Sequence, residues 1–229
     1  MKRAFPILAV FTAVQLSYAL YQALVVAPTD QAQGDVYRII YYHVPSAWTA
    51  FVLFATNFVA SVIYLIKRNA KADMVALVAA EVGVVFCTVV LVTGPIWARP
   101  VWGIWWTWDI RLTSTLVLWL IYVSYLMLRR FSISAQTPVM AAVLAVFGAL
   151  DMPLVYFSIW FFRTQHPQPV VGGGGSIDPR MLHVWMINWA AFLCFAGLVF
   201  WSRYHLERVQ RVVDEAHALR ALRDPGSSR

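Results

Sequence analysis

The chain has little charge. Asp, Glu, Lys and Arg together make up 13% of its 229 residues, about half the roughly 25% of an ordinary soluble domain. A soluble domain of this length exposes more surface than so few charges can cover. The composition therefore argues against a soluble enzyme, a disordered chain and a nucleic-acid-binding protein. Because 61% of the residues are hydrophobic and the mean hydropathy is +0.65, we predict a membrane protein with a single membrane domain.

Cysteine is also scarce, and the familiar catalytic motifs are missing. The two cysteines, Cys87 and Cys194, both lie in apolar runs, which excludes a disulfide framework and a CxxC redox pair. The sequence contains no GxSxG, phosphate-binding loop, HExxH or paired metal-ligand cysteines. We therefore predict that the chain is not an enzyme, and that any ATPase it works with is a separate subunit.

The long apolar runs predict membrane spans. A span needs roughly 20 apolar residues at 1.5 Å per residue, and backbone groups in lipid must be satisfied within the segment, so each run should be helical. Lys2 and Arg3 precede the first run, but its length favours a membrane helix over a signal peptide. We predict an all-α bundle of six transmembrane helices, at about residues 6–27, 45–66, 74–96, 112–128, 139–161 and 183–202.

The distribution of Lys and Arg predicts the orientation. Thirteen of the 18 lie at the termini and in the loops 67–73 and 129–138, and five lie in the segments on the other side. By the positive-inside rule both termini should be cytoplasmic, and the net charge of +7 then reflects topology, with some attraction to anionic lipid. We divide the chain into a membrane domain, 1–202, and a cytoplasmic amphipathic tail, 203–229, that should lie on the inner surface.

Tryptophan gathers in one outside segment, at residues 97–114. Five of the eleven tryptophans fall within twelve residues of it, whereas an interfacial aromatic belt usually contributes one or two per helix end. If the stretch is helical, Trp102, Trp105, Trp106 and Asp109 share one face. Such a face suits a large planar apolar ligand at the membrane surface, with Asp109 and Arg111 holding the loop or meeting polar edges of the ligand.

Histidines lie on the same side as the tryptophans. His43 precedes the second predicted helix and His166 follows the fifth, so both flank the Trp-rich segment, and His183 at the start of the sixth is a third candidate. A single histidine near an interface is usually structural. Two beside an aromatic surface favour a haem site, because neutral imidazole is an axial ligand of haem iron.

Two acidic residues lie inside predicted spans. Glu81 and Asp151 are costly in lipid, so they should face the bundle interior or be protonated. They could line a proton or ligand pathway, or they could make polar contacts between helices, for example with Thr88 or Ser158. Pro153, two residues after Asp151, should break or bend the helix expected at 139–161.

The run from Trp102 to Ser114, WGIWWTWDIRLTS, resembles the "WWD" signature, WGxWWxWDxRLTS, of the haem-handling proteins of cytochrome c biogenesis. Six helices with short loops are similar to the smallest branch of that family, the cytochrome c maturation C (haem exporter C) proteins. The resemblance extends from about Tyr37 to Leu198 and includes the run HVPSAW from His43 to Trp48.

This resemblance implies a haem site at the periplasmic face of the bacterial inner membrane, with haem b as the cofactor. The WWD segment would support the porphyrin, and His43 and His166 would ligate its iron. The family usually has two tryptophans and a leucine where Phe161, Phe162 and Gln165 stand here, so His183 is kept as an alternative to His166. The residues that match the signature are Trp102, Gly103, Trp105, Trp106, Trp108, Asp109 and Arg111.

The resemblance also implies partners. Family members present haem to a membrane-anchored periplasmic haem chaperone, and an ATP-binding-cassette pair and a very small membrane subunit complete the complex. Two other functions stay open: a transmembrane haem transporter with Glu81 and Asp151 along its path, and a covalent haem lyase acting on apocytochrome c. The clustering of site residues on one side disfavours the transporter, and the absence of a large outside domain from the predicted topology disfavours the lyase.

Overall fold

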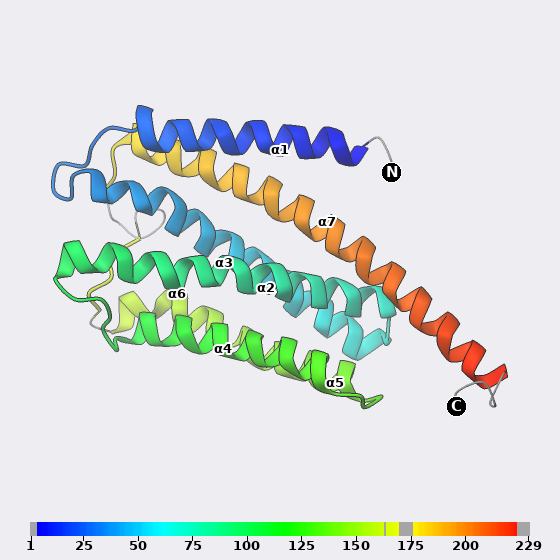
Figure 1. The fold of residues 1–229 in the computed structure, drawn as a ribbon. Helices are drawn as coiled ribbons and strands as arrows, with labels where there is room; N and C mark the ends of the chain where they lie inside the picture. The colour runs from blue at the N-terminus through cyan, green and yellow to red at the C-terminus, as the bar shows by residue number, and fades with distance from the viewer. Residues whose placement is uncertain (1–3, 163, 170–175, 224–229) are drawn as a thin grey trace.

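A computed structural model describes residues 4–162, 164–169 and 176–223, and within them the chain is helical with no β-strand (Figure 1). Six helical stretches are long and apolar enough to cross a membrane, which confirms the predicted six-helix bundle. The elements are α1 (Ala4–Tyr21), η1 (Gln22–Val26, a π-helix), η2 (Asp35–Ile39, a 3-10 helix), α2 (Ile40–Lys67), α3 (Ala70–Trp102), α4 (Ile110–Phe131), α5 (Thr137–Ala149), α6 (Asp151–Phe161) and α7 (Pro179–Arg223).

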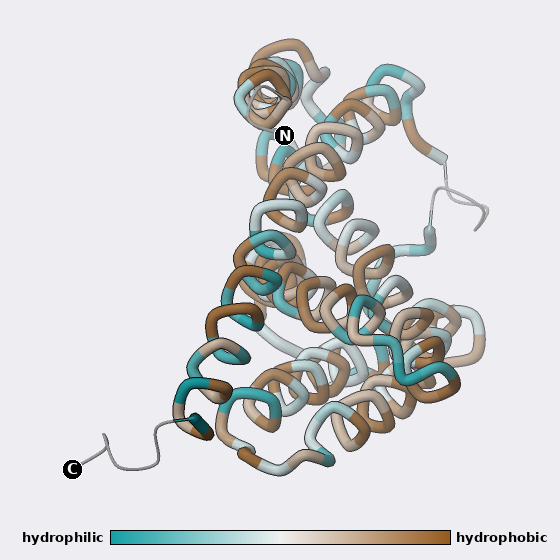
Figure 2. The backbone as a smooth tube through the Cα atoms, turned by 90° about the vertical axis from the view of Figure 1, so that its right-hand side faces the viewer, coloured by the Kyte–Doolittle hydropathy of each residue, from teal (hydrophilic) through white to brown (hydrophobic). Residues whose placement is uncertain are grey.

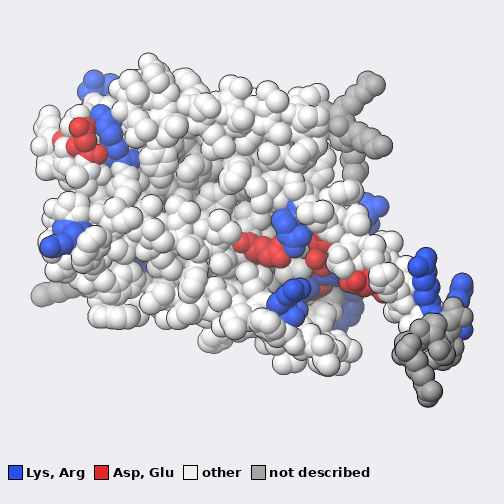
Figure 3. All heavy atoms as spheres, viewed as in Figure 1, with Lys and Arg blue, Asp and Glu red and all other residues white. Residues whose placement is uncertain are grey.

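The start of α1 and the end of α7 lie toward one end of the bundle, and the segments 27–34 and 103–109 lie at the other (Figure 1). We call the second the tryptophan-rich end. Seen along the bundle from the end with the termini, the helices are mostly apolar, and polar residues concentrate in loops and in the last part of α7 (Figure 2). On the face in view, one group of charged side chains lies at the tryptophan-rich end and another extends from about the middle of the bundle toward the opposite end, with an uncharged region between them (Figure 3).

Helix α3 is longer at its tryptophan-rich end than the predicted span 74–96. It continues through Pro95 and Pro100 to Trp102, although each proline removes a backbone donor. The helix ends where Gly103 takes a φ of 78° and its N–H bonds the carbonyl of Arg99 at 3.0 Å. This left-handed position favours glycine, so Gly103 of the signature serves to turn the chain out of the helix.

The span expected at 139–161 is divided, as Pro153 predicted. Helices α5 and α6 part at Leu150, where Pro153 has no N–H to bond the carbonyl of Ala149. Before the break, α5 packs against α2 and α4. After it, α6 packs against α4 and has little contact with α2. The two halves of this span therefore follow different neighbours.

Helix α7 is 45 residues long and passes without interruption through the predicted end of the sixth span at residue 202. A separate helix lying on the inner surface is not seen, because residues 203–223 continue the axis of α7 (Figure 1). The division into a membrane domain and a tail remains a prediction. The continuation is attached to the bundle by ion pairs: Arg203 binds Glu81 at 2.8 Å, and Arg211 binds Asp73 at 2.7 Å.

The two intramembrane acids have different surroundings. Glu81 of α3 pairs with Arg203 rather than with a hydroxyl group, so it is a contact between helices. Asp151 is half-buried at the start of α6, and its Oδ2 has no hydrogen-bond partner among the described residues.

Buried aromatic and amide side chains fix the interior. Phe54 of α2 stacks on Tyr122 of α4 with ring centroids 3.9 Å apart. Asn57 donates to the Ala76 carbonyl at 2.7 Å, and Asn188 of α7 donates to the carbonyl of Ala19 in α1 at 3.4 Å. Hydrogen bonds of this kind join helices inside a bilayer, and they hold the bundle around the cavity described next.

Candidate ligand-binding site

A cavity of about 1110 Å³ opens at the tryptophan-rich end. Pockets for small ligands usually measure about 300–1,000 Å³, so this one has room for a large cofactor. It extends from Thr29 and Asp178 in the end loops to Phe54 and Leu118 in the interior. His43 and Phe54 are eleven residues apart on α2, so the cavity reaches about 16 Å along that helix. Its lining includes His43, Trp48, Trp97, Trp102, Trp106, Arg111, His166 and Trp185.

The hydrogen bond of His43 defines its tautomer. Its Nδ1 lies 2.9 Å from Oγ1 of Thr93 on α3. The Thr93 hydroxyl donates its own hydrogen to the carbonyl of Val89 at 2.6 Å, so Oγ1 must accept from an Nδ1–H. Nε2 of His43 therefore carries the free lone pair. Metal-binding histidines are commonly held in this way, by a second group that receives the other ring N–H.

His166 is held in the same tautomer by its own neighbour. Its Nδ1 lies 3.0 Å from the carbonyl oxygen of Pro167, which can only accept, so Nδ1 carries the hydrogen and Nε2 is free. The two predicted ligands come from α2 and from the segment after α6, and they line one cavity. The described residues contain no cluster of three or more metal-ligating side chains, so an iron here would need the ring nitrogens of its own porphyrin.

The charge state of His166 suits a metal ligand. Burial, with a smaller contribution from the positive charge of Arg111, lowers the pKa of His166 to about 3. The imidazole is therefore neutral at physiological pH, which is the form that binds iron.

Asp109 connects the Trp-rich segment to His166. It caps α4 by accepting from the Leu112 N–H at 2.9 Å. Its other oxygen accepts from the hydroxyl of Thr164 at 2.9 Å, and Thr164 accepts from the backbone N–H of His166 at 3.1 Å. Asp109 thus holds the loop, as expected from the sequence, and it also positions the segment that carries His166.

The predicted tryptophan surface is only partly formed as expected. The segment 103–109 is not helical, so Trp102, Trp105 and Trp106 do not share a helix face. Trp102 and Trp106 line the cavity, whereas Trp105 and Trp108 do not and are 59% and 77% exposed. The reason is the turn at Gly103, which ends the helical periodicity on which the prediction depended.

Three other tryptophans complete the aromatic lining, and sequence reasoning did not assign them to the site. Trp48 of α2 and Trp185 of α7 form an edge-to-face pair 6.0 Å apart, and Trp97 makes an edge-to-face pair with Trp102 at 4.9 Å. Trp97 also donates to Oε1 of Gln33 at 2.8 Å, which attaches the loop 28–34 over the cavity. Trp48 lies five residues after His43 within the HVPSAW run, and this spacing is the one sequence signal that could have indicated it.

The cavity also contains donors that lack acceptors. Arg111 Nη1, Trp106 Nε1 and Trp185 Nε1 are buried and have no hydrogen-bond partner among the described residues, and all three residues line the cavity. A buried donor without a partner costs about 1–3 kcal/mol. A ligand that brings carboxylate oxygens would satisfy these groups, so the donor set fits the two carboxylates of haem.

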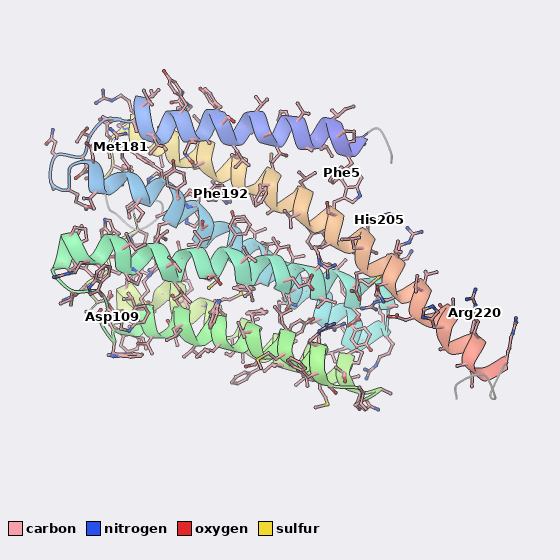
Figure 4. The ribbon with its side chains drawn as sticks, viewed as in Figure 1. Phe5, Asp109, Met181, Phe192, His205 and Arg220 are labelled. Carbon is pink, nitrogen blue, oxygen red and sulfur yellow. The ribbon has the colours of Figure 1, made fainter. Side chains whose placement is uncertain are left out.

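The remaining candidates lie elsewhere. His183 is exposed and is absent from the cavity lining, which favours His166 as the second ligand. Glu81 and Asp151 are also absent from the lining. His205 lies far along α7 from Asp109 and Met181, which mark the tryptophan-rich end (Figure 4). His217 is exposed on the same part of α7.

Fold and site together define a polytopic helical membrane protein with one aromatic, bis-histidine cavity at the end opposite its termini. The family model described as "Heme exporter protein C" matches residues 1–219, and the chain belongs to that family. Heme exporter protein C of Bradyrhizobium diazoefficiens is 34% identical over 229 residues, covering 99% of this chain and 87% of the relative.

Two further relatives agree. Heme exporter protein C of Escherichia coli K12 is 36% identical over 188 residues, which is 82% of this chain and 76% of the relative. A putative ccmC-like mitochondrial protein of cytochrome c biosynthesis from Marchantia polymorpha is 35% identical over 183 residues, which is 80% of this chain and 78% of the relative. The similarity therefore includes bacterial and mitochondrial proteins and extends over most of each chain.

Proposed function

We propose that this protein holds haem b in the cavity at its tryptophan-rich end, with His43 and His166 as the two axial ligands. The observation that carries the proposal is the pair of histidines that line one cavity, each with Nδ1–H bonded and Nε2 free. Nothing else in the cavity lining combines two neutral nitrogen ligands. The family membership supports haem as the cargo.

The rest of the lining would hold the porphyrin. Trp102 and Trp106 offer ring faces from the signature, and Trp48 and Trp185 offer rings from α2 and α7. An indole buries roughly 150–250 Å², so four of them supply most of the apolar contact that a planar ligand needs. The carboxylates would accept hydrogen bonds from Arg111 and from the indole N–H groups that lack partners.

Delivery is the proposed outcome of binding. The tryptophan-rich end would face the periplasm, because 13 of 18 Lys and Arg residues lie in the segments of the opposite side, and the chain would reside in the bacterial inner membrane. There it would present haem to a membrane-anchored periplasmic haem chaperone, assisted by an ATP-binding-cassette pair and a small membrane subunit. Trp105 and Trp108 are exposed beside the cavity, where they would meet the chaperone or lipid headgroups.

The protein would act by positioning rather than as a catalyst. Fixing the porphyrin by two ligands and a set of donors would present one edge of it to the chaperone in a defined orientation, and the reactivity itself belongs to the haem. Arg111 and the ligand histidines hold the cargo, while Asp109 and Thr164 keep the second ligand in place.

Single substitutions test the ligands. His43→Ala and His166→Ala should each change the haem absorption spectrum of the purified protein and lower haem retention, and added imidazole should restore part of both. His183→Ala is the matched control and should behave as wild type. If His183→Ala loses the ligand signature and His166→Ala keeps it, the second ligand is His183.

The acceptor of haem separates delivery from the two other functions. Haem-loaded protein in vesicles should transfer haem to a periplasmic haem chaperone and should not attach it to apocytochrome c. Attachment to apocytochrome c would indicate a lyase, and movement of haem across the vesicle membrane by this chain alone would indicate a transporter.

A further inference from the structure

A second hollow lies on the side of the bundle, between α2 and the break that separates α5 from α6. It has a volume of about 520 Å³ and an almost entirely apolar lining. We call it the side groove. Its α2 wall includes Phe51, Ala55 and Phe58, and its other wall includes Leu150, Pro153 and Tyr156.

The divided span creates this groove. Helix α5 packs against α2 as far as the break at Leu150, and beyond it α6 stays with α4 and has little contact with α2. A gap between α2 and α6 follows from this change of neighbour. A continuous helix packed along α2 would close this gap, so the break between α5 and α6 opens a hollow on the lateral face of the bundle.

The side groove adjoins the main cavity. Phe51 and Tyr156 line both hollows, so these two side chains stand between them. Tyr156 is 39% exposed and Phe51 is only partly buried. Side chains that are not enclosed by a core change rotamer quickly, so the separation can open without moving a helix.

The groove lies at the depth of the hydrocarbon. Leu150 is eleven residues before Phe161, the last residue of α6 at the tryptophan-rich end, which places it about 16 Å below that end. The hydrocarbon core is about 30 Å thick. With the end of α6 at the boundary of the hydrocarbon, a molecule in the groove would contact lipid chains rather than water.

We propose that haem reaches the cavity from within the bilayer, sideways through the side groove and past Phe51 and Tyr156. This inference rests on the proposed haem-binding function. The apolar porphyrin ring of a haem dissolved in lipid matches the apolar groove. The buried donors of Arg111 and Trp185, which have no hydrogen-bond partner among the described residues, line the main cavity and not the groove. The carboxylates therefore gain partners only after passage, which favours movement inward.

The test fills the groove from either wall and measures the rate of haem uptake. Ala55→Trp and Ala149→Trp each place an indole in the groove. If one of these variants fails to insert into the membrane, the other is enough for the test. Val59→Trp is the matched control, because Val59 is also on α2, is 53% exposed and lines neither hollow. The full-length protein is reconstituted in vesicles that contain haem in the bilayer, and uptake is followed by haem absorption.

We expect the groove-filling variants to take up haem at least tenfold more slowly from the bilayer, with the final spectrum and occupancy of wild type. Haem supplied from the aqueous side on albumin should load all variants equally. Uptake by both groove variants at the wild-type rate would overturn the lateral route. The route would be overturned even if these variants had lost a co-purifying membrane subunit or a bound lipid. A wild-type protein that binds no haem from either donor would contradict the proposed function itself.

Discussion

The hydrogen bond from His43 to Thr93 decides which ring nitrogen of His43 is free, and it joins residues 50 positions apart in the chain. Thr93→Val removes the acceptor, so the ring can rotate or change tautomer. We expect haem affinity to fall roughly 10–100-fold, the usual cost of losing such a second group, and the haem spectrum to become heterogeneous.

Thr93→Ser keeps the hydroxyl and should behave as wild type. Thr56→Val is the matched control, because Thr56 bonds only the carbonyl of Val52 on its own helix. Equal haem titrations for Thr93→Val and Thr93→Ser would show that this hydrogen bond does not position His43.

The titration of His166 gives a second prediction at this scale, made for the protein without haem. Burial and the positive charge of Arg111 lower its pKa to about 3, with a smaller lowering from His43. The hydrogen bond to the Pro167 carbonyl and the charge of Asp109 raise the value in part. An unfolded histidine has a pKa of about 6.5, so His166 should stay neutral at pH 5, where the unfolded chain is protonated. The contribution of this group to folding stability is then full above pH 6.5 and declines toward pH 3.

Histidine-selective NMR measures this directly, with His166→Ala to identify the signal. A transition of His166 near pH 6.5 would mean that the imidazole is open to water and that the cavity does not hold it in its neutral form.

Among the elements, one buried carboxylate joins three helices, α3, α4 and α7. Asp73, near the start of α3, is 4% exposed and receives Arg129 of α4 at 2.6 Å and Arg211 of α7 at 2.7 Å. Removing one partner of a buried ion pair typically costs 3–5 kcal/mol. We expect Asp73→Ala to destabilise the protein by about that amount in detergent unfolding experiments.

The exposed pair Asp178–Arg180 provides the comparison, since exposed pairs contribute little. Asp178→Ala should leave the unfolding midpoint nearly unchanged. If the two variants unfold alike, the cluster around Asp73 does not fasten α7.

The transmembrane helices were largely predictable from the sequence, because a run of apolar residues long enough to cross the lipid must be a helix. The residues at which the helices end were harder to predict. The helix α3 tolerates Pro95 and Pro100, and α7 continues beyond its apolar part because Arg203 and Arg211 find acidic partners on α3. The ion pairs join residues more than 100 positions apart, so periodicity and composition could not indicate the length of α7.

The sequence indicated part of the cavity lining: His43, His166, Trp102 and Trp106 were singled out, and all four line it. Their role as haem contacts remains a prediction. Trp185 was not indicated, because it reaches the cavity only where α7 packs against α1 and α2. The link from Asp109 to Thr164 spans 55 residues. Contacts of this kind depend on how distant helices meet, and a single sequence does not record that.

At the scale of the whole molecule, the orientation in the membrane has a direct test. Ala32 lies in the loop over the cavity and Ala70 at the start of α3 near the termini, and both are exposed. A membrane-impermeant thiol reagent added to intact cells should label Ala32→Cys and should not label Ala70→Cys. Wild type carries two free cysteines, buried Cys87 and half-buried Cys194, and its labelling measures the background. The reverse pattern would place the cavity in the cytoplasm.

The unbroken length of α7 also has a mechanical consequence. At 1.5 Å per residue its 45 residues form a rod of about 68 Å, with Trp185 in the cavity wall near one tip and Arg220 beyond the bundle near the other. A rod pivoting at its midpoint by about 5° moves each tip by about 3 Å. A force applied to the far tip would thus displace one wall of the cavity, with the helix as a lever and no relay of side chains in between.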